Sequence, residues 1–287
     1  MSIDAIKTVA VLGAGTMGNG IAHVFARSGY KVILRDVEQR FLDRGLETIG
    51  KNLDREIEKG RLAQAEKATA LARLQPVTDM AAIAAADFVV EAVPEKIEIK
   101  RAVLTEADGI LRPDVILASN TSSIAMTTLA ALTKRPDRFV GMHFMNPVPV
   151  MVLVEVIRAL QTNDTTFSVT RELATRLGKT PVAVNDAPGF VSNRVLMPLI
   201  NEAVYCVLEG VATPEAVDAV MKLGMNHPMG PLELADFIGL DVCVDIMHVL
   251  HDGLGDSKYQ ACPLLKKYVA AGWLGRKSGR GFYSYAK

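Results

Sequence analysis

Length, composition and charge set the first bounds on this chain. It has 287 residues, 49% of them hydrophobic, and its 32 basic side chains balance 32 acidic ones. This balance argues against nucleic acid or an anionic membrane surface as a partner. No apolar run approaches the ~20 residues that cross a bilayer. The length suits one large domain or two of ordinary size.

The cysteines bear on the compartment. Cys206, Cys243 and Cys262 are scattered and form no Cys-x-x-Cys pair. Such a set is typical of reduced thiols in a cytoplasmic protein, and it favours neither a disulfide framework nor a zinc site. The first predicted strand begins at Thr8, so we expect no targeting segment ahead of it.

A glycine-rich turn follows this first strand. The apolar run Thr8–Leu12 leads directly into Gly13-x-Gly15-x-x-Gly18 and then into a helical pattern. Gly13 permits a tight turn, Gly15 lets a pyrophosphate approach the backbone, and Gly18 lets the helix lie against the sheet. The N–H groups of the first helical turn would face the phosphates.

A second strand, Lys31–Arg35, ends at Asp36, 18 positions after Gly18. A carboxylate at this point accepts hydrogen bonds from an adenosine ribose. Strand, glycines, helix, strand and acid in this order predict dinucleotide binding. The alternative is a tight turn in an α/β protein that binds nothing.

The segment of about 38–74 predicts a helical hairpin. An apolar stripe runs from Phe41 to Ile57, Gly60 ends it, and a second helix covers about Ala63–Leu74. The solvent side carries four cationic residues, Lys51, Arg55, Lys59 and Arg61. Their charge alone favours an ordinary solvated face.

Alternating strands and helices continue to residue 186. We predict further strands at 75–77, 87–93, 115–119, 139–144, 152–156 and 181–184, with helices at 96–111 and about 165–178. This alternation predicts an α/β fold of Rossmann type, with a mostly parallel sheet and helices on both faces.

Strand patterns stop near residue 187. We therefore expect a dinucleotide-binding domain over 1–186 and an all-helical domain over 187–287, whose first helix runs from Pro188 to about Leu208. Apolar clusters there, including Val204, Val207, Leu208 and Val220, exceed what a small bundle needs inside. This excess suggests a homodimer formed through the second domain.

Polar residues follow two of the predicted strands. Asn120-Thr121-Ser122-Ser123 follows one strand, and His143 ends the next. Glu155 lies 12 residues further on, inside an apolar run, where a charge needs a partner. Ligands of such sheets bind at the carboxyl ends of the strands. We therefore predict that Glu155 pairs with His143, although a lone histidine is more often a packed core residue.

A histidine and carboxylate pair suits the dehydrogenation of an alcohol. The imidazole removes the hydroxyl proton as hydride leaves the carbon, and the carboxylate stabilises the imidazolium. The other histidines are weaker candidates. His23 is expected to pack on the first helix, and His248 and His251 lack a third ligand, so no metal is predicted.

The sequence resembles the L-3-hydroxyacyl-CoA dehydrogenases, and among them the stand-alone bacterial 3-hydroxybutyryl-CoA dehydrogenases, over nearly its whole length. The motifs include Gly-Ala-Gly-Thr-Met-Gly at 13–18, Val-Pro-Glu at 93–95, Ala-Ser-Asn-Thr-Ser-Ser at 118–123 and Met-His-Phe-Met-Asn-Pro at 142–147. They continue with Leu-Val-Glu-Val at 153–156, Ala-Pro-Gly-Phe-Val-Ser-Asn-Arg at 187–194, Asn-His-Pro-Met-Gly-Pro at 226–231 and Gly-Arg-Lys-Ser-Gly at 275–279.

The resemblance implies specific roles. It makes His143 the catalytic base and Glu155 its partner, and it makes Ser122 and Asn193 the residues that hold substrate. It implies that the hairpin binds coenzyme A through Asn52 and Lys59, which reverses the interpretation from charge alone. The implied cofactor contacts are Gly13, Gly15, Thr16, Met17, Gly18, Asp36, Glu95, Lys100, Asn120, Ser122, Asn146 and Lys277.

The implied reaction interconverts a 3-hydroxyacyl-CoA, such as 3-hydroxybutyryl-CoA, and the 3-ketoacyl-CoA. Asp36 favours NAD because it repels the 2′-phosphate of NADP, although Arg35 could accept that phosphate. Two alternatives stay open. One is a related two-domain dehydrogenase acting on a free hydroxy acid or sugar acid, and the other is a dinucleotide-binding protein without catalysis.

Overall fold

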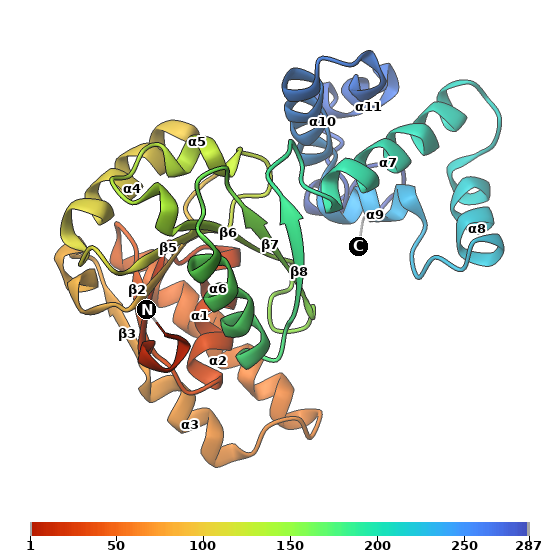
Figure 1. Cartoon of the computed structure of the whole chain (residues 1–287). Helices are drawn as coiled ribbons and strands as arrows, with labels where there is room; N and C mark the ends of the chain where they lie inside the picture. The colour runs from red at the N-terminus through yellow and green to blue at the C-terminus, as the bar shows by residue number, and fades with distance from the viewer. Residues whose placement is uncertain (1, 286–287) are drawn as a thin grey trace. The chain divides into compact units, whose positions relative to one another are not determined.

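The computed structural model describes residues 2–285 of the chain (Figure 1). The chain divides into two compact units, Met1–Ala187 and Pro188–Lys287. Strands and helices alternate along the first unit, whereas the second is built from helices.

The first unit is organised around an eight-stranded sheet in the order β3-β2-β1-β4-β5-β6-β7-β8. The strands are β1 (Thr8–Leu12), β2 (Lys31–Arg35), β3 (Leu74–Val77), β4 (Phe88–Glu91), β5 (Ile116–Ser119), β6 (Phe139–Phe144), β7 (Leu153–Arg158) and β8 (Thr180–Asn185). The first six pair in parallel, in the order of a doubly wound nucleotide-binding sheet. β7 runs antiparallel to β6, and β8 parallel to β7. The predicted mostly parallel α/β fold is confirmed.

Helices cover both faces of this sheet (Figure 1). They are α1 (Thr16–Arg27), α2 (Gln39–Glu58), α3 (Gln64–Ala72), α4 (Ile97–Ile110), α5 (Met126–Ala130) and α6 (Asp164–Arg176). Successive side chains of a strand point to opposite faces. Val9 and Val11 of β1 accordingly share a core with Ile21 of α1 and Leu173 of α6. Strands covered on both faces read as continuous apolar runs, which is why β4 and β5 are apolar almost throughout.

The predicted hairpin is formed by α2 and α3, which both pack against α1. Leu42, Ile49 and Leu53 of the apolar stripe are fully buried. The second helix ends at Ala72, not at the predicted Leu74. Leu74 is instead the first residue of the edge strand β3, and it pairs with Val32 of β2.

The second unit contains α7 (Ser192–Leu208), α8 (Pro214–Gly224), α9 (Pro231–Ile238), α10 (Leu240–Leu254) and α11 (Pro263–Ala270). Thr213 caps α8 by accepting a hydrogen bond from the backbone N–H of Ala216, with Pro214 in the first turn. The prediction that α7 starts at Pro188 is wrong. Gly189 and Phe190 have φ angles of 72° and 52°, which a helix cannot contain, so α7 begins at Ser192.

One residue of the predicted apolar excess is a core residue. Val204 is fully buried in the core of the second unit, and Val207 packs against that core. Val204 therefore cannot contribute to a dimer surface. Leu208 and Val220 are exposed. Between residues 2 and 285, no helix has both the length and the apolarity needed to span a bilayer.

Candidate active site

The glycine turn closes tightly where β1 ends. Gly13 has a φ of +100°, and a Cβ there would lie 2.7 Å from the carbonyl oxygen of Ala92. A Cβ on Gly18 would lie 1.8 Å from the carbonyl oxygen of Gly13. A Cβ on Gly15 would meet no atom within 4 Å, so this glycine borders open space. Two glycines therefore close the turn, and the third leaves room beside the backbone for a ligand.

The N-terminus of α1 borders the same space. Gly15 is the N-cap of α1, and no side chain caps this end of the helix. Thr16 is exposed and Met17 half-buried in the first turn. Because the first N–H groups of a helix attract anions, the turn fits a dinucleotide pyrophosphate.

Asp36 is fixed against the glycine turn. Its Oδ2 atom accepts a hydrogen bond of 2.6 Å from the N–H of Ala14, and Oδ1 accepts one of 2.7 Å from Val37. These bonds hold the carboxylate at the end of β2, where the sequence predicts the ribose contact. Arg35, the preceding residue, is half-buried at the end of β2.

The loop that carries Ser122 is held by Glu95. One oxygen of Glu95, Oε1, accepts hydrogen bonds from the N–H groups of Ser122 at 3.0 Å and Ser123 at 3.1 Å, and also from the hydroxyls of Thr121 and Ser123. The other, Oε2, lies 3.2 Å from Nζ of the buried Lys100. Burial by itself raises the pKa of Glu95, but the Lys100 ammonium and the hydroxyls outweigh it and lower that pKa.

Asn120 connects this loop to the strand that carries His143. Its N–H donates to the carbonyl of Glu91, and its Oδ1 accepts a 2.9 Å hydrogen bond from the N–H of Phe144. The loop after β5 and the end of β6 are thereby tied together. Ser122, half-buried, lies in this loop.

His143 and Glu155 lie directly opposite each other on antiparallel strands β6 and β7. The Nδ1 atom of His143 is 2.8 Å from Oε2 of Glu155, and both side chains are buried. The predicted pair therefore forms. A buried carboxylate at this distance holds the imidazole ring in one orientation.

Three other predicted residues lie in the loop after β6 and on the hairpin. Asn146 is exposed after β6 and precedes Pro147 across a cis peptide bond. On the hairpin, Asn52 accepts a 3.2 Å hydrogen bond from Arg55, and Lys59 is exposed at the C-cap of α2.

Two predicted residues belong to the second unit. Asn193 is buried in the first turn of α7. Lys277 is exposed and forms an ion pair of 2.6 Å with Asp241. Its ammonium is therefore engaged within its own unit.

The predicted packing of His23 is confirmed, with a partner that the sequence pattern does not reveal. His23 is fully buried on α1, and its Nε2 atom lies 3.4 Å from Oε1 of Glu56 on the hairpin. Arg27 also pairs with Glu56, at 3.1 Å. This cluster attaches the hairpin to α1.

Sequence reasoning missed Glu91, the last residue of β4. Glu91 is fully buried and lies 2.7 Å from Nζ of Lys100. The signal was available, because Glu91 interrupts the apolar run 88–93 in the same way that Glu155 interrupts the run 152–156.

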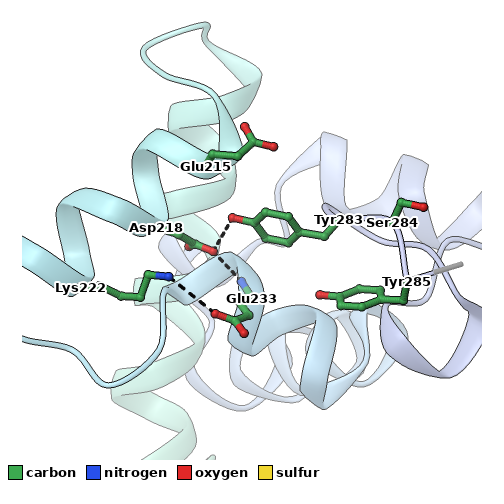
Figure 2. A pocket seen from close by; sticks show the side chains of 7 residues that line it. All are labelled: Glu215, Asp218, Lys222, Glu233, Tyr283, Ser284 and Tyr285. Carbon is green, nitrogen blue, oxygen red and sulfur yellow. Dashed lines mark hydrogen bonds and ion pairs between the residues drawn. The ribbon is translucent and has the colours of Figure 1, made fainter. Parts of the chain in front are cut away.

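A hollow of about 420 Å³ lies in the second unit (Figure 2). Asp218, Glu233 and Tyr283 line it together with Glu215, Lys222, Ser284 and Tyr285. The Asp218 carboxylate accepts the N–H groups of Leu232 and Glu233 and the Tyr283 hydroxyl. Asp218 therefore caps α9 and anchors the C-terminal segment. None of the predicted cofactor or substrate residues is among these lining residues.

The fold and the polar cluster define a dinucleotide-binding dehydrogenase. Residues 8–187 match the family described as 3-hydroxyacyl-CoA dehydrogenase, NAD binding domain, and residues 189–285 match 3-hydroxyacyl-CoA dehydrogenase, C-terminal domain. The chain therefore belongs to the 3-hydroxyacyl-CoA dehydrogenase family.

Individual relatives are similar over nearly their full length. A probable 3-hydroxybutyryl-CoA dehydrogenase of Deinococcus radiodurans is 58% identical, over 96% of this chain and 99% of that protein. A 3-hydroxybutyryl-CoA dehydrogenase of Bradyrhizobium diazoefficiens is 54% identical, over 98% and 96%. The crystal structure of an (S)-3-hydroxybutyryl-CoA dehydrogenase from Ralstonia eutropha has a TM-score of 0.96 and 51% identity, and covers 99% of this chain and 100% of that one.

Proposed function

We propose that this protein interconverts (S)-3-hydroxybutyryl-CoA and acetoacetyl-CoA by hydride transfer with NAD(H). The observation that carries this proposal is the buried His143 and Glu155 pair, with Nδ1 and Oε2 2.8 Å apart, beside the loop that holds Ser122. The names of the relatives at 54–58% identity support the choice of substrate.

His143 moves the hydroxyl proton in this proposal. Glu155 engages Nδ1, so we assign the proton transfer to Nε2. In oxidation, Nε2 takes the proton of the 3-hydroxyl as the C3–O bond becomes a carbonyl, and Glu155 stabilises the imidazolium that forms. The bound nicotinamide supplies the acceptor for the hydride that leaves C3. In the reverse direction, the imidazolium returns its proton to the carbonyl oxygen.

Ser122 and Asn193 hold the thioester end of the substrate in this proposal. A hydroxyl and an amide side chain can each donate a hydrogen bond to a carbonyl oxygen. Glu95 fixes the backbone N–H of Ser122 at 3.0 Å, which supports a fixed position for this side chain. Asn193 lies in the first turn of α7, in the second unit.

The hairpin binds the coenzyme A moiety in this proposal. Lys59 and Arg61 are exposed at the end of α2, beside Arg55 and Asn52. Cationic side chains pair with phosphate oxygens through charge-assisted hydrogen bonds. Lys51 is a weaker candidate, because its ammonium lies 2.6 Å from Glu47.

Asp36 favours NAD over NADP in this proposal. Its two carboxylate oxygens are held by backbone N–H groups, so the negative charge stays beside the position of the ribose. That charge would repel a 2′-phosphate. The remaining cofactor contacts are assigned to the glycine turn, Thr16, Met17, Glu95, Lys100, Asn120, Ser122, Asn146 and Lys277.

We further propose a homodimer in the cytoplasm. Val220, Leu223 and Met225 on and after α8 are each more than 60% exposed, which supports an apolar contact surface on the second unit. The cysteines among the described residues are free thiols, as in a reducing compartment. Sedimentation as a monomer at micromolar concentration would argue against the dimer.

An assay of NADH oxidation tests the proposed activity. We expect turnover with acetoacetyl-CoA, none above background with free acetoacetate, and a lower kcat/KM with NADPH. Faster turnover of free keto acids or sugar acids would instead support a related hydroxy-acid dehydrogenase. NADH binding without turnover of any 3-ketoacyl-CoA would support a non-catalytic protein.

A further inference from the structure

Glu91 occupies an unusual position for a carboxylate. It is the last residue of β4, with its side chain fully buried in the centre of the sheet. A buried charge is costly unless it is paired and hydrogen-bonded. Both carboxylate oxygens of Glu91 accept hydrogen bonds. Their partners connect Glu91 to the loop that carries Ser122.

The first branch runs through Lys100. Oε1 of Glu91 accepts hydrogen bonds from Nζ of Lys100 at 2.7 Å and from the N–H of Val93 at 2.8 Å. The same ammonium lies 3.2 Å from Oε2 of Glu95. Glu95 in turn binds the N–H groups of Ser122 and Ser123. The Lys100 ammonium is thus shared between a carboxylate in the sheet and a carboxylate at the loop.

The second branch runs through Ser119. Oε2 of Glu91 accepts a hydrogen bond of 2.6 Å from the Ser119 hydroxyl, whose oxygen accepts one of 3.2 Å from the N–H of Thr121. The main chain adds a third link, because the carbonyl of Glu91 accepts the N–H of Asn120 at 2.8 Å. Each branch ends within residues 119–123.

We infer that Glu91 is a positioning residue that fixes the Ser122 loop and Glu95 for the nicotinamide cofactor. Because its side chain is fully buried, we assign it an action through Lys100 and Ser119 and not through direct contact with a ligand. This inference rests on the proposed function for the roles of Glu95 and Ser122. Polar networks of this kind, when every member is satisfied, hold one arrangement of the groups they join.

The substitution Glu91→Gln tests the inference because it keeps the shape and removes the charge. Lys100 would then have one carboxylate partner, Glu95, and would draw it away from the N–H groups of residues 122 and 123. The amide N–H₂ could not accept the hydroxyl hydrogen of Ser119. We expect the Kd for NADH, measured by fluorescence titration without acyl-CoA, to rise about tenfold or more.

Asp108→Asn is the matched control. Asp108 is another buried carboxylate of the first unit, 2.6 Å from Nε of Arg135, and neither residue contacts the loop 119–123 in the hydrogen bonds of the described chain. We expect it to lower Tm about as much as Glu91→Gln while leaving the Kd for NADH within about twofold of wild type. An equal rise in Kd for both variants would mean general destabilisation and would overturn the inference.

Ser119→Ala gives a second measurement that keeps the Glu91 and Lys100 pair. It removes the Ser119 branch alone, and we expect a smaller rise in the Kd for NADH, of about threefold. If Glu91→Gln fails to fold, this variant decides. If the Kd for NADH is unchanged in Ser119→Ala, or in a folded Glu91→Gln variant, the positioning role of Glu91 is overturned.

These measurements separate the inference from the proposed function. Because NADH binding is measured without acyl-CoA, a wild-type protein that ignores acetoacetyl-CoA would refute the proposed activity and leave the role of Glu91 measurable. Wild-type turnover of acetoacetyl-CoA together with unchanged NADH binding in Glu91→Gln would refute the role of Glu91 alone.

Discussion

His143 and Glu155 face each other across the one antiparallel pairing in the described sheet, with Nδ1 and Oε2 2.8 Å apart. Residues directly opposite on antiparallel strands have Cβ atoms about 4.5–5.5 Å apart and on the same face. The reversal of the chain between β6 and β7 therefore brings the carboxylate to the imidazole. In a parallel pairing, a connection of only eight residues could not have placed them opposite each other.

Replacing His143 tests its role as the base. His143→Gln keeps a polar side chain but cannot carry the proton, so we expect kcat to fall by about 100-fold or more. The Kd for NADH should stay within about twofold, because the residue acts on the substrate hydroxyl. His248→Gln, on the exposed side of α10, is the control and should retain full turnover. Ordinary turnover by His143→Gln would show that another group is the base.

Asp36→Asn tests the preference for NAD. The amide removes the charge that repels a 2′-phosphate and weakens the acceptor for the ribose hydroxyls and for the N–H of Ala14. We expect KM to rise about tenfold for NADH and to fall for NADPH. The preference for NADH over NADPH should therefore shrink by ~1.4 kcal/mol or more. Asp43→Asn, on the exposed side of α2, should change neither value. If Asp36→Asn and wild type showed the same preference between the two cofactors, Asp36 would not be the residue that selects NAD.

Two alanine substitutions in the glycine turn should affect different properties, one the stability of the fold and the other the binding of NADH. A Cβ on Gly18 would overlap the carbonyl of Gly13, so Gly18→Ala should lower the free energy of unfolding by about 1–3 kcal/mol or more. A Cβ on Gly15 meets only open space, and its φ of −63° suits alanine. Gly15→Ala should therefore keep Tm and raise the Kd for NADH about tenfold. Thermal unfolding and titration of both variants separate the two effects, and undisturbed NADH binding by Gly15→Ala would count against a pyrophosphate at this position.

The ionisation of Glu95 predicts a pH-dependent contribution to stability. Burial raises its pKa, but Lys100 and the loop hydroxyls outweigh this effect, so the pKa in the folded protein lies below the ordinary value of 4.5. A lowered pKa stabilises the fold above the unfolded value, and that stability is lost as the pH falls through the folded value. Glu95→Gln should therefore lower Tm most above pH 5, and the difference from wild type should shrink below pH 4.5. Glu106→Gln, on an exposed part of α4, controls for the loss of one carboxylate. A difference that grows on acidification would contradict this assignment.

Local patterns in the sequence were sufficient for the glycine turn, Asp36 and the alternation of strands and helices. Each depends on residues close together in the chain: a glycine needs its conformation where it stands, and a buried parallel strand is apolar wherever it is placed. The same reasoning identified Glu155 as a buried charge in need of a partner. It failed at the start of α7, because the positive φ angles of Gly189 and Phe190 are set by the fold around them.

Only the tertiary structure decided which charges meet and which apolar residues are covered. Glu91 ends a strand, Lys100 lies in the next helix, and Glu95 lies in the turn between them. The Ser122 loop that they hold is more than 20 residues further along the chain. Val204 and Val220 look alike in sequence, yet the first is buried in the bundle and the second is exposed. Helical or strand periodicity selects a face, whereas strand order and packing select the partner on that face. This is why the sequence alone could predict a dinucleotide-binding turn and a candidate base, but not the network that fixes the loop between them.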